Sequence, residues 1–116
     1  MAVVATAPES GAPYTLQSAA TSGNGNAVAP PHSFKYHSIY IEGTSGVGAG
    51  AVQVETSLDP NDANTWAPLT TSPTTVIAGG IAIVQVTGII QILRARISTT
   101  VTGGTVTVNY VGAKLC

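Results

Sequence analysis

The sequence predicts an all-β fold: an antiparallel β-sandwich or a jelly-roll-like barrel that carries an extended N-terminal arm. Short segments of alternating apolar and polar residues recur at close spacing along the chain, which is the pattern of half-buried strands. Clusters rich in Gly, Pro, Asn and Asp separate these segments, and no segment has the period of an amphipathic helix. Roughly seven or eight short strands joined by turns are typical of a sandwich or barrel.

The chain of 116 residues fits a single domain preceded by an arm. Residues 1–30 are rich in small and polar residues and are interrupted by prolines. We therefore expect residues 1–13 to be flexible or docked on a partner, and residues 14–116 to form one β-sandwich domain. A first strand is expected over 14–18.

The segment 34–42 is a strong strand prediction because it is dense in aromatic and β-branched residues. Its alternation places Phe34, Tyr36 and Tyr40 on one face, and Ile39 and Ile41 on the other with His37. Apolar groups on both faces indicate a central strand, or one that contacts something beyond its own sheet.

The glycine-rich segment 43–50 is expected to be a hairpin loop that leads into a strand over 51–58. Alternation in that strand divides its residues between the two faces: Val52, Val54, Thr56 and Leu58 inward, and Gln53, Glu55 and Ser57 outward. After a turn at Asp59–Asn64, Trp66 is expected to re-enter the core, and 74–77 and 81–87 are two further strand segments.

The segment Gln91–Gly112 is expected to be an antiparallel hairpin. Leu93, Ala95 and Ile97 alternate with Arg94 and Arg96 in the first arm, and the second arm alternates in the same way. Gly103 and Gly104 between the arms supply the positive φ angles that tight turns need.

Charged residues make up only 8% of the chain, against roughly 25% in an average soluble domain. Weak self-repulsion favours a protein that works in an assembled state, although a neutral extracellular β domain has the same composition.

A net charge of −1 with four basic residues argues against nucleic acid as a partner. No apolar run is long enough to span a bilayer, and the N-terminus has no signal-peptide pattern, so we expect synthesis in a cytoplasm and no membrane partner.

No motif indicates an enzyme, a cofactor or a metal site. Asp59–Asn64 offers oxygen ligands but lacks the spacing of a calcium loop, so a plain turn is the favoured interpretation. His32 and His37 are expected to face solvent or to be hydrogen-bonded. Glu42 and Glu55 could face each other on adjacent strands, but nothing else builds a catalytic cleft.

Arg94 and Arg96 point to the same side of one strand. They either form an intramolecular ion-pair ladder with Glu55 or bind an acidic partner surface. The candidates for partner contact are the apolar residues of the arm and first strand together with these two arginines: Val3, Val4, Tyr14, Leu16, Arg94 and Arg96.

Three segments, YTLQSAATSGNGNAV (14–28), AVQVETSLDPNDANTWAPL (51–69) and ILRARISTTVTGGTVTVNYVG (92–112), resemble small structural proteins of tailed bacteriophages. The resemblance covers the chain from Tyr14 onward, and its motifs are structural ones. It implies a non-enzymatic virion protein of the capsid decoration (cement) type, located on the outer capsid surface. Its implied partners are the major capsid protein and further copies of itself in a homotrimer.

An alternative implied by the same resemblance is a tail, baseplate or fibre module that binds a host receptor or carbohydrate. Receptor-binding members are usually longer or carry shaft repeats, and this chain has neither, which favours the head of the particle.

Overall fold

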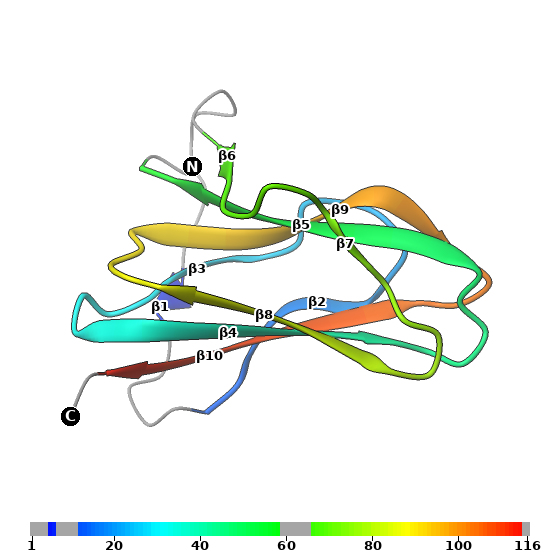
Figure 1. Cartoon of the computed structure of the whole chain (residues 1–116), viewed down its shortest axis with the longest axis horizontal. Coiled ribbons are helices and arrows are strands. Elements are labelled where there is room, and N and C mark those ends of the chain that lie inside the picture. Colours follow the sequence, from blue (N-terminus) through cyan, green and yellow to red (C-terminus); the bar gives the residue numbers. More distant parts are fainter. Residues whose placement is uncertain (1–4, 7–11, 59–65, 115–116) are drawn as a thin grey trace.

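The computed structural model describes residues 5–6, 12–58 and 66–114, and these form a β-sandwich without helices. Two sheets pack face to face (Figure 1). The six-stranded sheet contains β1 (Ala5–Thr6), β3 (Ala27–Ala29), β9 (Ile92–Thr102), β5 (Ala49–Ser57), β6 (Ala67–Pro68) and β7 (Thr74–Thr75). The four-stranded sheet runs in the order β2 (Tyr14–Ala20), β10 (Val106–Lys114), β4 (Phe34–Gly43) and β8 (Ile81–Thr87). The predicted fold class is confirmed.

Strand pairing within the sheets differs from the prediction. The arms of the expected hairpin at 91–112 are β9 and β10, which belong to different sheets: β9 pairs with β5 and β3, whereas β10 pairs with β4 and β2. The segment 43–50 is likewise not a hairpin loop, because β4 and β5 lie in opposite sheets. Alternation indicates which side chains of a strand share a face, but it contains no information about the neighbouring strand.

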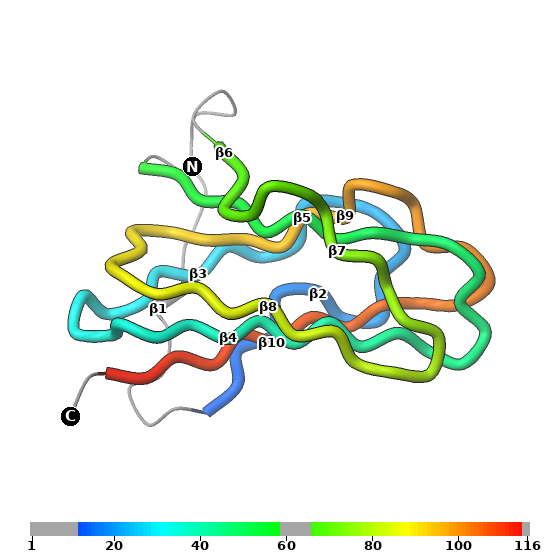
Figure 2. Tube along the Cα trace, viewed as in Figure 1, coloured from blue at the N-terminus to red at the C-terminus, as the bar shows by residue number. Residues whose placement is uncertain are grey.

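The connections between the sheets interlock at one end of the sandwich, on the right in Figure 2. The N–H of Thr44 donates to the Thr105 carbonyl (3.0 Å), and the N–H of Thr105 donates to Thr44 Oγ1 (3.0 Å). The Thr44 carbonyl accepts from the N–H of Gly79 (3.0 Å), which belongs to the connection that leads into β8. Gly46 and Gly103 pack backbone to backbone, so that a Cβ on either would meet the carbonyl oxygen of the other. Glycine is therefore required here for close approach.

The core lies between the sheets and is formed by the inward side chains of both. Its fully buried members include Leu16, Ile39, Leu93, Val108 and Tyr110. As predicted, β4 is a central strand, between β10 and β8.

Three predicted side-chain positions are wrong. Phe34 does not share a face with Tyr36 and Tyr40: it lies inside, 2% exposed, because the β4–β10 register shifts at its end. Leu58 is 83% exposed rather than inward, since β5 ends one residue before it. Trp66 is half-buried outside the core, where its ring contacts Arg94.

Candidate functional site

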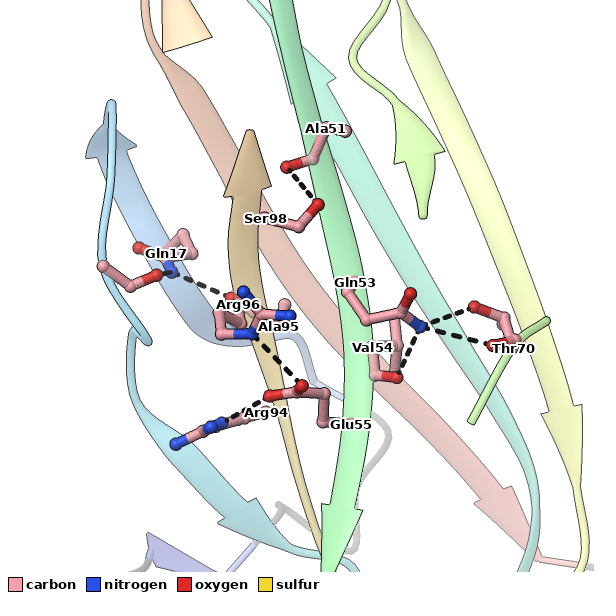
Figure 3. Close-up of polar contacts among 11 residues, drawn as sticks. Gln17, Ala51, Gln53, Val54, Glu55, Thr70, Arg94, Ala95, Arg96 and Ser98 are labelled. Carbon is pink, nitrogen blue, oxygen red and sulfur yellow. Dashed lines mark hydrogen bonds and ion pairs between the residues drawn. The ribbon is translucent and has the colours of Figure 1, made fainter. Parts of the chain in front are cut away.

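The two arginines predicted as partner contacts hold a carboxylate of their own chain. Arg94 Nε donates to Glu55 Oε1 (2.9 Å) and Arg96 Nε donates to Glu55 Oε2 (3.1 Å), as Figure 3 shows. Register places Glu55 directly opposite Arg94 on the neighbouring strand. Of the two alternatives left open by the sequence, the intramolecular ladder is the one present.

The ladder is partly shielded from water. The side chains of Glu55 and Arg94 are 9% and 15% exposed, and the Arg94 guanidinium lies 4.0 Å from the centroid of the Trp66 ring. A guanidinium at this distance over an aromatic ring makes a cation–π contact. Only Arg96, 37% exposed, presents much of its side chain to solvent. The two arginines therefore serve first to pair with the largely buried carboxylate of Glu55.

The predicted outward strand face of β5 is covered rather than free. Gln53 and Glu55 point away from the core yet are only 5% and 7% exposed. The segment after β6 covers Gln53, whose Nε2 donates to Thr70 Oγ1 (2.9 Å) (Figure 3). This outer face is thus a layer of internal polar bonds.

The remaining predicted partner contacts have mixed positions. Leu16 is fully buried in the core of its own chain and cannot contact a partner in this fold. Tyr14 is half-buried and packs against the same core. Val3 and Val4 lie outside the described residues. Within the predicted arm, β1 pairs in parallel with β3 of the same chain.

The two carboxylates that could have faced each other do not. Glu42 is exposed on β4, and Glu55 lies on β5 of the opposite sheet. The Asp59–Asn64 turn lies outside the described residues. Among residues 5–6, 12–58 and 66–114, no group of three or more His, Cys, Asp or Glu side chains could hold a metal ion.

His37 is buried, 1% exposed, in a hydrogen-bonded position, which the sequence allowed. Its Nε2 lies 2.8 Å from the Gly88 carbonyl, which can only accept, so Nε2–H is the donor. The Tyr110 hydroxyl then donates to Nδ1 (2.7 Å). Burial lowers the pKa of His37, opposed by the bond to Gly88, and burial raises the pKa of Tyr110 to about 12. This pair faces the core and is structural.

His32 is exposed, and its Nε2 lies 3.0 Å from Gln91 Oε1. One histidine is therefore exposed and the other is buried and hydrogen-bonded, and the sequence prediction included both positions.

An accessible apolar surface lies on the outer face of the four-stranded sheet. We call its apolar centre the Tyr/Ile face and define it by Tyr36, Tyr40, Ile81, Ile83 and Val111. Tyr36, Ile81 and Ile83 are 48%, 50% and 55% exposed, and Tyr40 and Val111 are half-buried. Register places Tyr40 directly beside Ile83. Contiguous exposed apolar side chains of this kind mark interaction surfaces in soluble proteins.

A hollow of about 310 Å³ lies on this outer face. Polar and apolar groups both line it: Pro13, Tyr40, Glu42, Ile81, Asn109 and Val111. Beside it, Thr15 Oγ1 donates to Asn109 Oδ1 (2.9 Å). Glu42 is the one charged side chain in this lining. The hollow suits an apolar group with a polar edge.

Sequence reasoning pointed to this surface only indirectly. Apolar residues on both faces of 34–42 indicated either a central strand or a contact beyond the sheet. The strand is central, and Tyr36 and Tyr40 are the apolar residues on its outer face. Sequence reasoning missed Ile81 and Ile83, although the segment 81–87 has apolar residues at both even and odd positions through Val84. That doubled pattern was the available signal.

Comparisons with protein-family models, with curated proteins and with solved structures find no match to this chain. In the described part of the chain no helix is long and apolar enough to cross a membrane.

Proposed function

We propose that this chain is a non-enzymatic structural protein of a bacteriophage particle, a decoration protein that binds the head shell through protein–protein contact. The observation that carries the proposal is the Tyr/Ile face, in which Tyr36, Ile81 and Ile83 are about half exposed on the outer side of a four-stranded sheet. Aromatic and aliphatic side chains on a regular element are the usual anchors of protein interfaces. The proposal that the partner is a bacteriophage particle rests on the resemblance of three segments to phage structural proteins.

The mechanism is linkage. A protein that binds the assembled shell, and not its dissociated subunits, stabilises the shell in proportion to the logarithm of its free concentration over its dissociation constant. With a net charge of −1, the chain adds little electrostatic repulsion when many copies lie close together on one lattice.

The first test is the copy number of this chain in purified particles, measured by quantitative mass spectrometry against the major shell protein. A ratio close to that of the shell protein is expected for decoration of the lattice. A few copies per particle would move the chain to a tail or vertex, and absence from particles would end the proposal.

The second test addresses the Tyr/Ile face itself. Tyr40→Ser and Val111→Ser remove apolar groups that line the hollow, and we expect each to lower shell occupancy at least about tenfold at limiting concentration. Thr100→Ala, at an exposed position of the opposite sheet, is the matched control. Equal occupancy for all three variants would show that another surface binds the shell.

A second candidate function, a tail module that binds carbohydrate, has one observation in its favour. Tyr40, Glu42 and Asn109 meet around the hollow, and an aromatic ring beside a carboxylate and an amide can bind the apolar and hydroxyl faces of a sugar. Titration of sugars against the NMR signals of Asn109 tests this. Trp66 fluorescence is unsuitable as the reporter, because Trp66 contacts Arg94 of the other sheet.

A further inference from the structure

Strand β8 is an unusually open sheet edge. Its seven residues pair with β4 over their whole length without a register shift, and in the described part of the chain no other strand pairs with β8. The other outer strands are protected. β1, β6 and β7 have two residues each, and β2 has register shifts and a loop that bonds to it from Asn26 N–H to the Leu16 carbonyl.

The backbone groups of β8 that face away from β4 can be identified. The N–H of Gly88 donates to the Lys35 carbonyl (2.8 Å), and the N–H of Gly43 donates to the Gly80 carbonyl (3.1 Å). These bonds fix the phase of the antiparallel ladder, in which alternate residues bond to the partner strand. The residues between them direct both N–H and C=O to the free edge: Ile81, Ile83, Gln85 and Thr87.

Native proteins usually blunt such an edge with a charge, a proline, a bulge or a covering segment. The sequence IAIVQVT has no charged residue, no Pro and no Gly, and it has no bulge. The other three edges of this sandwich are protected, whereas β8 has no charge, proline or bulge, and the strand that lies near it from the other sheet, β7, has two residues. This exposed edge is the feature that needs a function.

We propose that β8 pairs antiparallel with β8 of a second copy of this chain, so that two four-stranded sheets join into one. A two-fold axis at Val84 places Ile81 opposite Thr87 of the second copy, and Ile83 opposite Gln85. In this register all four outward-directed residues are hydrogen-bonded pairs, each of which exchanges two backbone bonds. A two-fold contact of identical surfaces is the commonest form of protein dimer.

The side-chain pattern of β8 supports a second β8 as the strand that pairs with its free edge. An added strand must place apolar residues over the core side, and β8 does so with Ala82, Val84 and Val86, which pack against the core. Its other face adds Ile81 and Ile83 to the exposed surface, so the Tyr/Ile faces of two copies become one continuous face. Because β8 has no charged residue, its pairing with a second β8 brings no like charges opposite each other.

The pairing is independent of the proposed function, and it differs from the trimer that the resemblance implies. We expect sedimentation equilibrium of the full chain, from micromolar to millimolar concentration, to show a monomer–dimer equilibrium. A chain that stays monomeric throughout, or associates only as a trimer, would overturn the proposal. Neither result bears on the copy number in particles.

Amide hydrogen exchange measured by NMR locates the contact. At high concentration the amides of Ile81, Ile83, Gln85 and Thr87 become protected, and on dilution they exchange rapidly. The amides of Ala82, Val84 and Val86 bond to β4 and stay protected at both concentrations. A dimer in which the first four amides exchange rapidly would place the interface elsewhere and refute the pairing.

Two pairs of variants distinguish an effect on pairing at the β8 edge from an effect on folding of the single chain. Gln85→Pro removes one outward donor while leaving the bonds to β4, whereas Gln85→Ala removes the side chain and keeps the donor. Ile83→Lys brings two like charges to diagonal positions of the joined sheet, and Ile83→Thr does not. We expect the first variant of each pair to raise the dimer dissociation constant at least about tenfold over its control. Equal constants in the Ile83 pair, whose side chain is exposed, would contradict the proposal even if Gln85→Pro failed to fold.

Discussion

At the scale of single residues, the polar side chains inside this sandwich all have partners. Among the described residues no buried side-chain nitrogen or oxygen lacks a hydrogen bond. Gln17, 4% exposed, is an example, since its Nε2 donates to the Ala95 carbonyl of the opposite sheet (2.8 Å) (Figure 3). Such a bond ties the sheets together where an apolar contact would only fill space.

The buried His37–Tyr110 pair predicts how stability depends on pH. The folded state holds His37 neutral, with a pKa below the 6.5 of the unfolded chain, so below pH 6.5 the unfolded chain binds a proton that the folded chain resists. The contribution of His37 to the free energy of unfolding is therefore fully present above pH 6.5, and it is lost as the pH falls below that value. Urea unfolding at about pH 7.5 and about pH 5.5 measures the loss.

His37→Gln should remove most of that pH dependence, and His32→Gln, at the exposed histidine, should keep it. An unchanged pH dependence in His37→Gln would assign the effect to another group.

On the alkaline side, Tyr110 with a pKa of about 12 keeps its proton when an ordinary tyrosine has lost it. Stability should accordingly also decline as the pH rises above 10.

The Glu55 ladder gives a second prediction at this scale. Glu55→Gln leaves Arg94, 15% exposed, without its carboxylate, so we expect a loss of about 1–3 kcal/mol in the free energy of unfolding. Glu42→Gln, at an exposed carboxylate of the other sheet, should change stability by less than about 0.5 kcal/mol. Chemical denaturation of both variants at one pH makes the comparison, and equal effects would mean that the ladder contributes nothing measurable.

At the scale of elements, the interlocked connections depend on close backbone approach. Gly103 has φ +78°, and a Cβ there would meet the Gly46 carbonyl. We expect Gly103→Ala to lower the free energy of unfolding by more than about 2 kcal/mol, through backbone strain and steric contact together.

Gly23→Ala is the matched control, because Gly23 has φ +104° and nothing within 4 Å of an added Cβ. It isolates the cost of the left-handed backbone. Thermal or urea unfolding that shows Gly103→Ala no less stable than Gly23→Ala would contradict the close packing of the two connections.

The same connections show how far the sequence could predict the fold. Strands and inward faces follow from alternation, which is local, and so 92–97 was placed correctly. Pairing is not local. The Gly103–Gly104 turn is short enough for a hairpin, yet β9 and β10 pack across the core because each finds its ladder partner far away in sequence.

The candidate site was predictable only in part for a related reason. Tyr36 and Tyr40 could be assigned to one face by counting along a single strand. The Tyr/Ile face also requires that β8 lie beside β4, which brings Ile83 next to Tyr40 across 43 positions of sequence. No local pattern contains that pairing.

At the scale of the whole molecule, the two outer faces of the sandwich have different characters. The six-stranded sheet bears the Glu55 ladder and the covered Gln53, whose polar groups bond within the chain. The four-stranded sheet exposes the Tyr/Ile face and the open edge of β8. Association through one sheet leaves the other sheet's internal bonds undisturbed, so the fold permits assembly without a change of conformation.

Deletion of residues 1–13 tests the part that the arm plays in assembly. Within the described residues, every buried hydrophobic residue of the core lies at Leu16 or beyond, and the only described pairing that the truncation removes is the short β1–β3 pairing, so we expect the truncated chain to fold. We expect its occupancy on purified shells to fall while its urea unfolding stays cooperative.

Deletion of residues 1–11 is the control, since it keeps Pro13 at the hollow. If both truncations lose occupancy equally, the arm itself binds; if only the longer one does, the hollow is responsible. Unchanged occupancy in both would remove the arm from the interface and leave the Tyr/Ile face to carry it.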